Sequence, residues 1–261
     1  MKVVILCGGK GTRLREETEF RPKPMVPIGS RPILWHIMKI YAAHGFNEFI
    51  LCLGYKGQMI KDFFIHYDTR LQDCTVTLGT AKGIQYHSRH EEIDWTVTLA
   101  ETGLESLTGT RLRLVQKYLA GPEDFMLTYG DGVSDVDLDA LLKFHRSHGK
   151  IMTVTGVRPP GRFGELLCDA AGRVTEFNEK PQATVGQISG GFFVCRPEIL
   201  RYLDPQANQM LEVEPMRQLV QEGQLMVFPH KGFWYPMDTY RDYTLLNSLV
   251  AKRQAPWIIW K

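Results

Sequence analysis

Long apolar runs are missing from the sequence. No stretch approaches the roughly 18 consecutive apolar residues that a membrane-spanning helix requires. The first apolar run, VVILC at residues 3–7, is too short for a secretory signal, and no small-residue cleavage pattern follows it. We therefore expect a cytoplasmic protein without a membrane partner.

Cysteine is scarce, and its few residues are scattered along the chain. They are Cys7, Cys52, Cys74, Cys168 and Cys195, an odd number without any Cys-x-x-Cys pair. Such a pattern is typical of reduced thiols in a cytoplasmic protein, and we expect most of them to serve packing.

Neither sign of charge is in excess. The 261 residues include 31 Lys and Arg and 29 Asp and Glu, for a net charge of +2. Nucleic-acid binding generally needs a basic excess, so we expect no nucleic-acid partner. Internal repeats, low-complexity segments and Gly-, Ser- or Pro-rich linkers are also absent. We predict a single domain over residues 1–261.

Strand-like apolar runs alternate with helical patterns. The runs are VVILC (3–7), EFILCLGY (48–55), DFMLTYGDG (124–132), MTVTGV (152–157) and SGGFFVC (189–195). Helical spacing is present at residues 31–45, where Pro32 marks the start and Gly45 the stop, and again at 135–149. This alternation predicts an α/β fold with a mixed, mainly parallel sheet flanked by helices, Rossmann-like in its arrangement. In such sheets ligands bind at the carboxyl ends of the strands.

Two regions interrupt this alternation. The polar stretch 80–102 is predicted to be an insertion or hairpin beside the sheet. In the last third, GRFGELLCD (161–169), RVTEFNEKP (173–181), LMVFPH (225–230) and GFWYPMD (232–238) predict shorter, partly antiparallel strands. We expect these strands to form the rim of a substrate pocket.

The turn LCGGKGTRL (6–14) follows the first strand and is both glycine-rich and cationic. We expect the chain to stay irregular from Gly8 to about Ser30. Glycines at positions 8, 9 and 11 allow backbone N–H groups to approach a ligand. The guanidinium of Arg13 can donate two parallel hydrogen bonds to phosphate oxygens, and the ammonium of Lys23 supplies a compact positive charge. The turn therefore predicts a polyphosphate site, with an exposed basic turn as the alternative.

Two other phosphate motifs do not match this turn. The Walker spacing is absent, and Leu14 replaces the last glycine of the dinucleotide fingerprint G-x-G-x-x-G. The second strand is followed by CLGYKG rather than by an acid for a ribose hydroxyl. A nicotinamide-dependent oxidoreductase is therefore the weaker alternative.

Two carboxylates follow predicted strands. Asp131 need not cap the next helix, because Ser134 with Asp137 is a better capping candidate. Thr239 with Asp242 likewise forms a capping-box pattern that leaves Asp238 free. Two carboxylates beside a polyphosphate site suit Mg²⁺, which binds through one or two carboxylates together with phosphate oxygens.

The motif GGKGTRL followed by RPKPMVPIG resembles the signature of the sugar-nucleotide pyrophosphorylases. The likeness continues through GYKG, YGDGVSDVD, NEKP, GGFFV and GFWYPMDT in the family's order. The segments RPILWHIMK, SLTGTRLR and PPGRFG resemble the corresponding segments of the family members that use CTP and glucose 1-phosphate. Cys7 departs from the pattern, because an alanine is commoner there.

The resemblance implies a fold, a reaction and a set of site residues. The fold would be GT-A-like, with a nucleotide-binding half over about 1–135 and a sugar-phosphate-binding half over about 136–261. The reaction would be Mg²⁺-dependent direct attack of glucose 1-phosphate on CTP, without a covalent intermediate, in a homo-oligomer. UTP, dTTP or another hexose 1-phosphate is an alternative, and a non-catalytic sugar-nucleotide sensor is another.

The implied residues fall into four sets. The nucleotide-binding set is Leu6, Cys7, Gly8, Gly9, Lys10, Gly11, Thr12, Arg13, Lys23, Ser106, Arg111 and Gly130. The sugar-phosphate-binding set is Glu179, Lys180, Gly191 and Trp234. Asp131 and Asp238 would bind the metal, and Arg13, Lys23 and Asp131 would be catalytic.

Several features keep a structural alternative. Arg111 is either a partner for a cytosine carbonyl or the basic face of a helix, and Trp234 with Tyr235 either stacks on the sugar or fills the core. Gly190 and Gly191 are expected inside a strand, where a sugar could approach the backbone. The histidine pairs 87/90 and 145/148 lack a third ligand for zinc. The final APWIIWK is either a subunit contact or part of the core.

Overall fold

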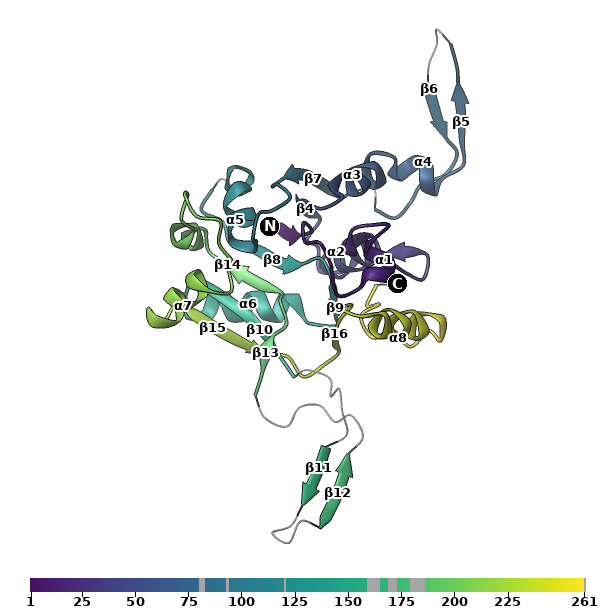
Figure 1. The fold of residues 1–261 in the computed structure, drawn as a ribbon. Helices are drawn as coiled ribbons and strands as arrows, with labels where there is room; N and C mark the ends of the chain where they lie inside the picture. Colours follow the sequence, from purple (N-terminus) through teal and green to yellow (C-terminus); the bar gives the residue numbers. More distant parts are fainter. Residues whose placement is uncertain are drawn as a thin grey trace.

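A mixed eight-stranded sheet forms the centre of the molecule (Figure 1). The computed structural model describes residues 1–79, 83–92, 94–119, 121–158, 165–168, 173–178 and 186–260. The strand order is β13-β10-β14-β8-β1-β4-β7, and β15 pairs with β10. The strands are β1 (Lys2–Leu6), β4 (Glu48–Leu53), β7 (Thr96–Glu101), β8 (Phe125–Tyr129), β10 (Met152–Val157), β13 (Ile188–Ser189), β14 (Phe193–Cys195) and β15 (Leu225–Pro229).

Parallel pairing predominates in this sheet. β1 is parallel to β4 and β8, β4 to β7, and β10 to β15. β14 runs antiparallel to both of its neighbours, and β13 runs antiparallel to β10. The predicted mixed, mainly parallel α/β fold is therefore confirmed.

Helices cover both faces of the sheet. The α-helices beyond residue 30 are α2 (Ile33–Ala43), α3 (Gly57–Ile65), α4 (Tyr67–Leu71), α5 (Thr108–Leu114), α6 (Leu138–His148), α7 (Glu214–Gln221) and α8 (Tyr240–Ala251). Of the 3₁₀ turns, η2 (Gln116–Tyr118) follows α5 and η3 (Pro197–Tyr202) follows β14. Side chains alternate across β1, so Val3 and Ile5 enter one apolar cluster while Val4 and Leu6 enter the other.

The expected helix boundaries hold with one correction. Pro32 precedes α2, and Gly45 adopts φ +79° just after it. The capping box of Thr239 and Asp242 at α8 is confirmed. At α6, however, Asp137 is the N-cap and accepts from Ala140 N at 2.9 Å. Ser134 cannot serve there, because it lies in β9 (Gly132–Ser134), ahead of the helix.

The segment after β1 is more regular than predicted. It contains α1 (Arg15–Thr18), η1 (Lys23–Met25) and a small hairpin of β2 (Pro27–Ile28) and β3 (Arg31–Pro32). Leu14 is fully buried, and Thr18 Oγ1 donates to Leu14 O at 2.8 Å. These tertiary anchors order a stretch whose local sequence predicts a loop.

Hairpins stand beside the sheet. β5 (Cys74–Thr77) and β6 (Gly83–Tyr86) form an antiparallel hairpin that projects beyond α4, as expected for part of the polar stretch (Figure 1). The run WTVTL becomes β7 at the edge of the central sheet. β11 (Glu165–Cys168) pairs antiparallel with β12 (Val174–Asn178), and β16 (Trp234–Pro236) pairs antiparallel with β9.

Two strand predictions were wrong in detail. LMVFPH is β15, a parallel strand of the central sheet rather than a rim strand. Gly190 and Gly191 lie between β13 and β14 rather than inside a strand. Gly191 has φ +73°, and a Cβ on Gly190 would lie 2.7 Å from Val157 Cγ1, so both positions require glycine for local reasons.

The C-terminal segment packs back on the core. Trp257 is fully buried, and the ring of Trp260 lies edge-on to Trp35 at 5.7 Å. The two alternatives for APWIIWK were a subunit contact and a part of the core, and the positions of its tryptophans support the second. In the ranges that the structure describes, no helix has the length and apolar character needed to cross a membrane.

The histidine pairs have protein partners. Their contacts are Thr75 for His87, Asp68 for His90, and Thr153 for both His145 and His148, each at 2.8 Å. These contacts place the first pair at the base of the β5–β6 hairpin and the second between α6 and β10.

We predict that acid destabilises the protein partly through His36. Burial lowers the pKa of His36 from 6.5 to about 4, so the folded state holds this ring neutral. A lowered folded-state pKa contributes stability above pH 6.5 that is lost as the pH falls towards 4. The difference between the two pKa values corresponds to about 3 kcal/mol of unfolding free energy. Urea unfolding between pH 7.5 and 4 should therefore show a flatter pH dependence for His36→Gln, and equal slopes for both proteins would contradict this.

Candidate active site

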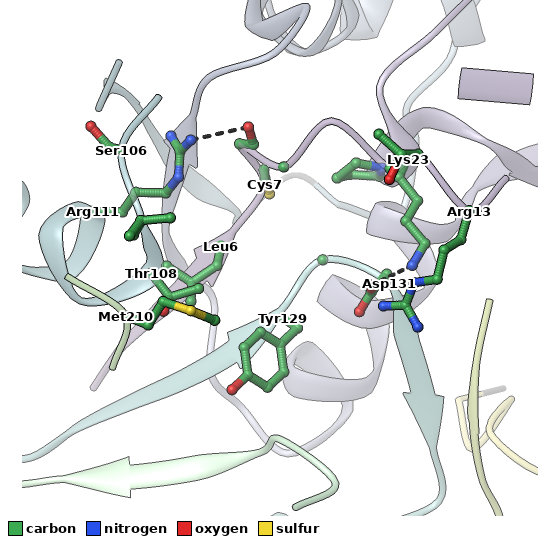
Figure 2. A pocket seen from close by; sticks show the side chains of 17 residues that line it. Leu6, Cys7, Arg13, Lys23, Ser106, Thr108, Arg111, Tyr129, Asp131 and Met210 are labelled. Atoms are coloured by element: carbon green, nitrogen blue, oxygen red, sulfur yellow. Dashed lines mark hydrogen bonds and ion pairs between the residues drawn. The ribbon is translucent and has the colours of Figure 1, made fainter. Parts of the chain in front are cut away.

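A cleft of about 320 Å³ opens at the carboxyl ends of β1 and β8 (Figure 2). The chain leaves β1 to form β4 on one side and returns later as β8 on the other side. Such a switch point is where open α/β sheets bind ligands. The lining residues are Leu6, Cys7, Gly8, Gly9, Gly11, Thr12, Arg13, Lys23, Pro24, Ser106, Leu107, Thr108, Arg111, Tyr129, Gly130, Asp131 and Met210.

A cluster of two cations and two acids occupies one end of the cleft. Lys23 Nζ donates to Asp131 Oδ2 and to Asp238 Oδ1, both at 2.6 Å. Arg13 NH1 donates to Asp238 Oδ2 at 2.9 Å. Burial alone would lower the pKa of Lys23, but the two carboxylates outweigh it and raise that pKa, so Lys23 is a fixed positive charge.

Strand pairing brings the two acids together. Asp131 directly follows β8, and Pro236 of β16 pairs with Gly132 of β9. Met237 N then donates to Asp131 O at 2.8 Å, which sets Asp238 beside Asp131. Two carboxylates far apart in the sequence therefore face one cation position.

Arg111 lies at the other end of the cleft and is almost fully buried. Its guanidinium donates to Leu53 O at 2.9 Å, Thr102 Oγ1 at 2.7 Å, Gly103 O at 2.8 Å, Gly8 O at 3.1 Å and Leu104 O at 3.3 Å. These bonds join the turn after β1 to the ends of β4 and β7. The contact with a cytosine carbonyl stays a prediction, and the structure adds a clamping role to it.

The glycines of the turn differ in what they face. A Cβ on Gly8 would lie 2.1 Å from Arg111 NH1, so Gly8 leaves room for the guanidinium. Gly11 adopts φ +64°. A Cβ on Gly9 would meet nothing within 4 Å, so the backbone of Gly9 is open to the cleft. Among the three, Gly9 best fits the predicted close approach of a ligand.

Cys7 lines the cleft as a protonated thiol. Burial raises the pKa of Cys7 well above its ordinary value, and the neighbouring Cys52 raises it further. A thiolate nucleophile is disfavoured at this position, which agrees with the predicted reaction without a covalent intermediate.

The cleft gathers most of the predicted nucleotide-binding residues. Eleven of the twelve line it, and the exception, Lys10, pairs with Glu105 at 2.8 Å on the surface. The sugar side is less complete. Glu179 and Lys180 lie outside the described residues, and Trp234 Nε1 donates to Gly190 O at 2.7 Å. Gly191 lies behind the ring of Tyr129 rather than in the wall of the cleft.

Five lining residues were missed by the sequence analysis. They are Pro24, Leu107, Thr108, Tyr129 and Met210. Tyr129 is the last residue of β8, so the strand-end rule that identified Asp131 applies to it as well. Met210 has no local signal, because a segment distant in the sequence brings it to the cleft.

Comparisons with known proteins show the family to which the chain belongs. The Nucleotidyl transferase family matches residues 2–253. The chain is 49% identical over 261 residues to the glucose-1-phosphate cytidylyltransferase of Salmonella typhi, covering 100% of both chains. It is 43% identical over 260 residues to a Bacillus subtilis protein named "Probable glucose-1-phosphate cytidylyltransferase", again covering 100% of both.

A solved structure shares the fold. Apo-UDP-glucose pyrophosphorylase superposes with a TM-score of 0.68 at 15% identity, covering 97% of this chain and 98% of that one. The match over nearly the whole sequence, the full-length relatives and the cleft at the strand ends lead to one assignment. The chain belongs to the nucleotidyl transferase family, as its motifs predicted.

Proposed function

We propose that this enzyme transfers the cytidylyl group from CTP to α-D-glucose 1-phosphate, forming CDP-glucose and pyrophosphate. The observation that carries the proposal is the 49% identity over the whole of both chains to the Salmonella typhi cytidylyltransferase. The cleft at the carboxyl ends of β1 and β8, with Arg13 and Lys23 at one end, supports it independently.

The reaction joins two anions, so positioning and charge neutralisation dominate. A phosphate oxygen of the sugar phosphate attacks the α-phosphorus of CTP, and the bond from that phosphorus to pyrophosphate breaks. The attacking oxygen is already anionic and requires no general base. Lys23 would stabilise the α-phosphate and Arg13 the departing pyrophosphate, as charge grows in the transition state.

The donor set fits a divalent cation. Members of this family generally use a divalent metal, and we propose Mg²⁺ held by Asp131 and Asp238. Both carboxylates approach one ammonium nitrogen at 2.6 Å, so their oxygens already converge on a single cation position. When bound, Mg²⁺ would supply further neutralisation of the phosphate charge.

We assign the sugar phosphate to the second half of the chain, about 136–261. Lys180 would contact the attacking phosphate and Glu179 a sugar hydroxyl, on the strength of the NEKP motif. Gly191 and Trp234 would support that side from behind, since Gly191 backs Tyr129 and Trp234 holds Gly190 O. The half at about 1–135 would bind the nucleotide.

We further propose a homo-oligomer in the cytoplasm. The β5–β6 hairpin exposes Val76, Leu78 and Ile84, with Leu78 at 86% exposure, which favours burial against another subunit. Free thiols at Cys7, Cys52, Cys74 and Cys195 suit a reducing compartment.

Pyrophosphate release with glucose 1-phosphate, Mg²⁺ and each nucleoside triphosphate in turn tests the proposal. We expect a strong preference for CTP that EDTA abolishes. Turnover with UTP or dTTP instead would keep the reaction and refute the base. If no nucleotide supports pyrophosphate release, the assay would be repeated with other hexose 1-phosphates. If none of these supports it either, the result would favour a sugar-nucleotide sensor.

A further inference from the structure

The segment between η3 and α7 crosses the start of α5. Gln209 O accepts from Gly109 N at 3.0 Å and from Thr110 N at 3.2 Å. The first N–H groups of a helix have no partner within the helix, and α5 has no capping side chain of its own. The crossing segment therefore completes the helix start that carries Thr108 into the cleft.

Glu212, in this segment, bridges two walls of the cleft. Its Oε2 accepts from Thr108 Oγ1 at 2.5 Å, and its Oε1 accepts from Tyr129 Oη at 2.6 Å. Thr108 begins α5 and Tyr129 ends β8, and both line the cleft. One carboxylate thus ties together side chains from two different elements (Figure 2 shows these side chains near Met210).

The direction of both hydrogen bonds is determined. Thr108 Oγ1 accepts from Leu211 N at 2.9 Å, which leaves its own proton for Glu212. A phenol keeps its proton at neutral pH, so Tyr129 Oη is the donor in its bond to Glu212 Oε1. Glu212 must therefore accept with both oxygens, which an ionised carboxylate does and an amide cannot.

The ring of Tyr129 is also held from the other sides. A Cβ on Gly191 would lie 3.0 Å from Tyr129 Cδ2, and the ring of Phe193 lies edge-on at 5.7 Å. Within the part of the chain that the structure describes, the polar restraint on the ring is the hydroxyl bond to Glu212.

We propose that Glu212 is a positioning residue for the nucleoside part of the nucleotide, acting through Thr108 and Tyr129. The cationic cluster of Lys23 and Arg13 lies at one end of the cleft, so a bound triphosphate there directs the nucleoside towards the end with Ser106 and Thr108 (Figure 2). The inference rests on the proposed function for the identity of that nucleotide.

Glu212→Gln tests this role, because glutamine keeps the length of the side chain and loses one acceptor. We expect the Kd for CTP, measured calorimetrically without sugar phosphate, to rise about tenfold, since a hydrogen bond to a charged group is lost. The KM for CTP should rise in parallel, whereas kcat and the KM for glucose 1-phosphate should change less than about threefold. Glu214→Gln is the matched control: it is exposed two residues along the chain, and we expect wild-type values.

Several outcomes would overturn the inference. An unchanged Kd for CTP with a lowered melting temperature would make Glu212 a purely structural residue. If Glu212→Gln does not fold, Tyr129→Phe and Thr108→Val each remove one donor with little change in shape, and each should raise the Kd about threefold. Unchanged affinity in both would overturn the role.

The inference and the proposed function fail in different ways. Wild-type protein that binds CTP but releases no pyrophosphate would refute the function and leave the comparison of Kd values decisive for Glu212. Wild-type protein that binds another nucleoside triphosphate would refute the base, and the same variants would then be compared with that nucleotide. Wild-type protein that binds no nucleotide would overturn both.

Discussion

Asp131→Asn is expected to lower kcat with CTP and glucose 1-phosphate by about 10³-fold. The carboxylate lies 2.6 Å from Lys23 Nζ and faces the same cation position as Asp238. Asparagine keeps the size and removes the charge, so a divalent cation would lose one of two anionic ligands where phosphate charge must be neutralised. Pyrophosphate release at saturating substrates measures the rate, and Mn²⁺ binding by electron paramagnetic resonance measures the site directly.

Asp68→Asn is the control for this variant. Asp68 is an exposed carboxylate on α4 that contacts His90 at 2.8 Å, away from the cleft. Its rate should stay within about twofold of wild type, as for other surface substitutions. An Asp131→Asn enzyme that keeps more than about a tenth of the wild-type rate would contradict the metal assignment.

Lys23→Met is expected to lower kcat by about 10²-fold to 10³-fold while the KM for CTP changes less than about threefold. The ammonium is almost fully buried, and its raised pKa keeps it charged. If its contact with the α-phosphate strengthens as charge grows there, its loss acts on the transition state more than on substrate binding. Steady-state kinetics separate the two, and an unchanged kcat would contradict the role.

Lys23→Met is also expected to strengthen metal binding, although it lowers kcat. In the structure the ammonium occupies the position between Asp131 and Asp238 that the metal is proposed to take. Without it, the two carboxylates lose a counter-ion, and Mn²⁺ should bind about tenfold more tightly in the absence of nucleotide. Lys143→Met, which changes an exposed lysine on α6, should leave both measurements at wild-type values.

The periodic parts of the sequence predicted most of the fold. Ile33, Ile37 and Ile40 are fully buried on α2, as their spacing predicts. Predictions from the sequence were weaker where a residue fits two different structural roles. Ser134 matches a capping pattern, but its strand pairing with Trp234 removes it from the helix start, and the cap passes to Asp137.

The residues of the site likewise fall into those that local sequence could predict and those that it could not. Gly9, Arg13 and Lys23 come from one continuous segment after β1, so their residue types and spacing predicted a polyphosphate site there, and the structure brings all three to the cleft. Tyr129 shares the strand end of Asp131 and could have been predicted from it. Glu212 could not, because its hydroxyl partners come from α5 and β8 through a segment that crosses both.

The sequence by itself determined the alternation of strands and helices, the cationic turn after β1 and the family of the chain. These depend on periodicity and on residues that are neighbours along the chain. Only the tertiary structure decided that Lys23 bridges Asp131 and Asp238, that Arg111 holds five acceptors, and that Glu212 joins two walls of the cleft. The physical reason is that these hydrogen-bond partners are brought together by the pairing of strands and the crossing of segments that are distant in the sequence. Local residue patterns do not contain that information.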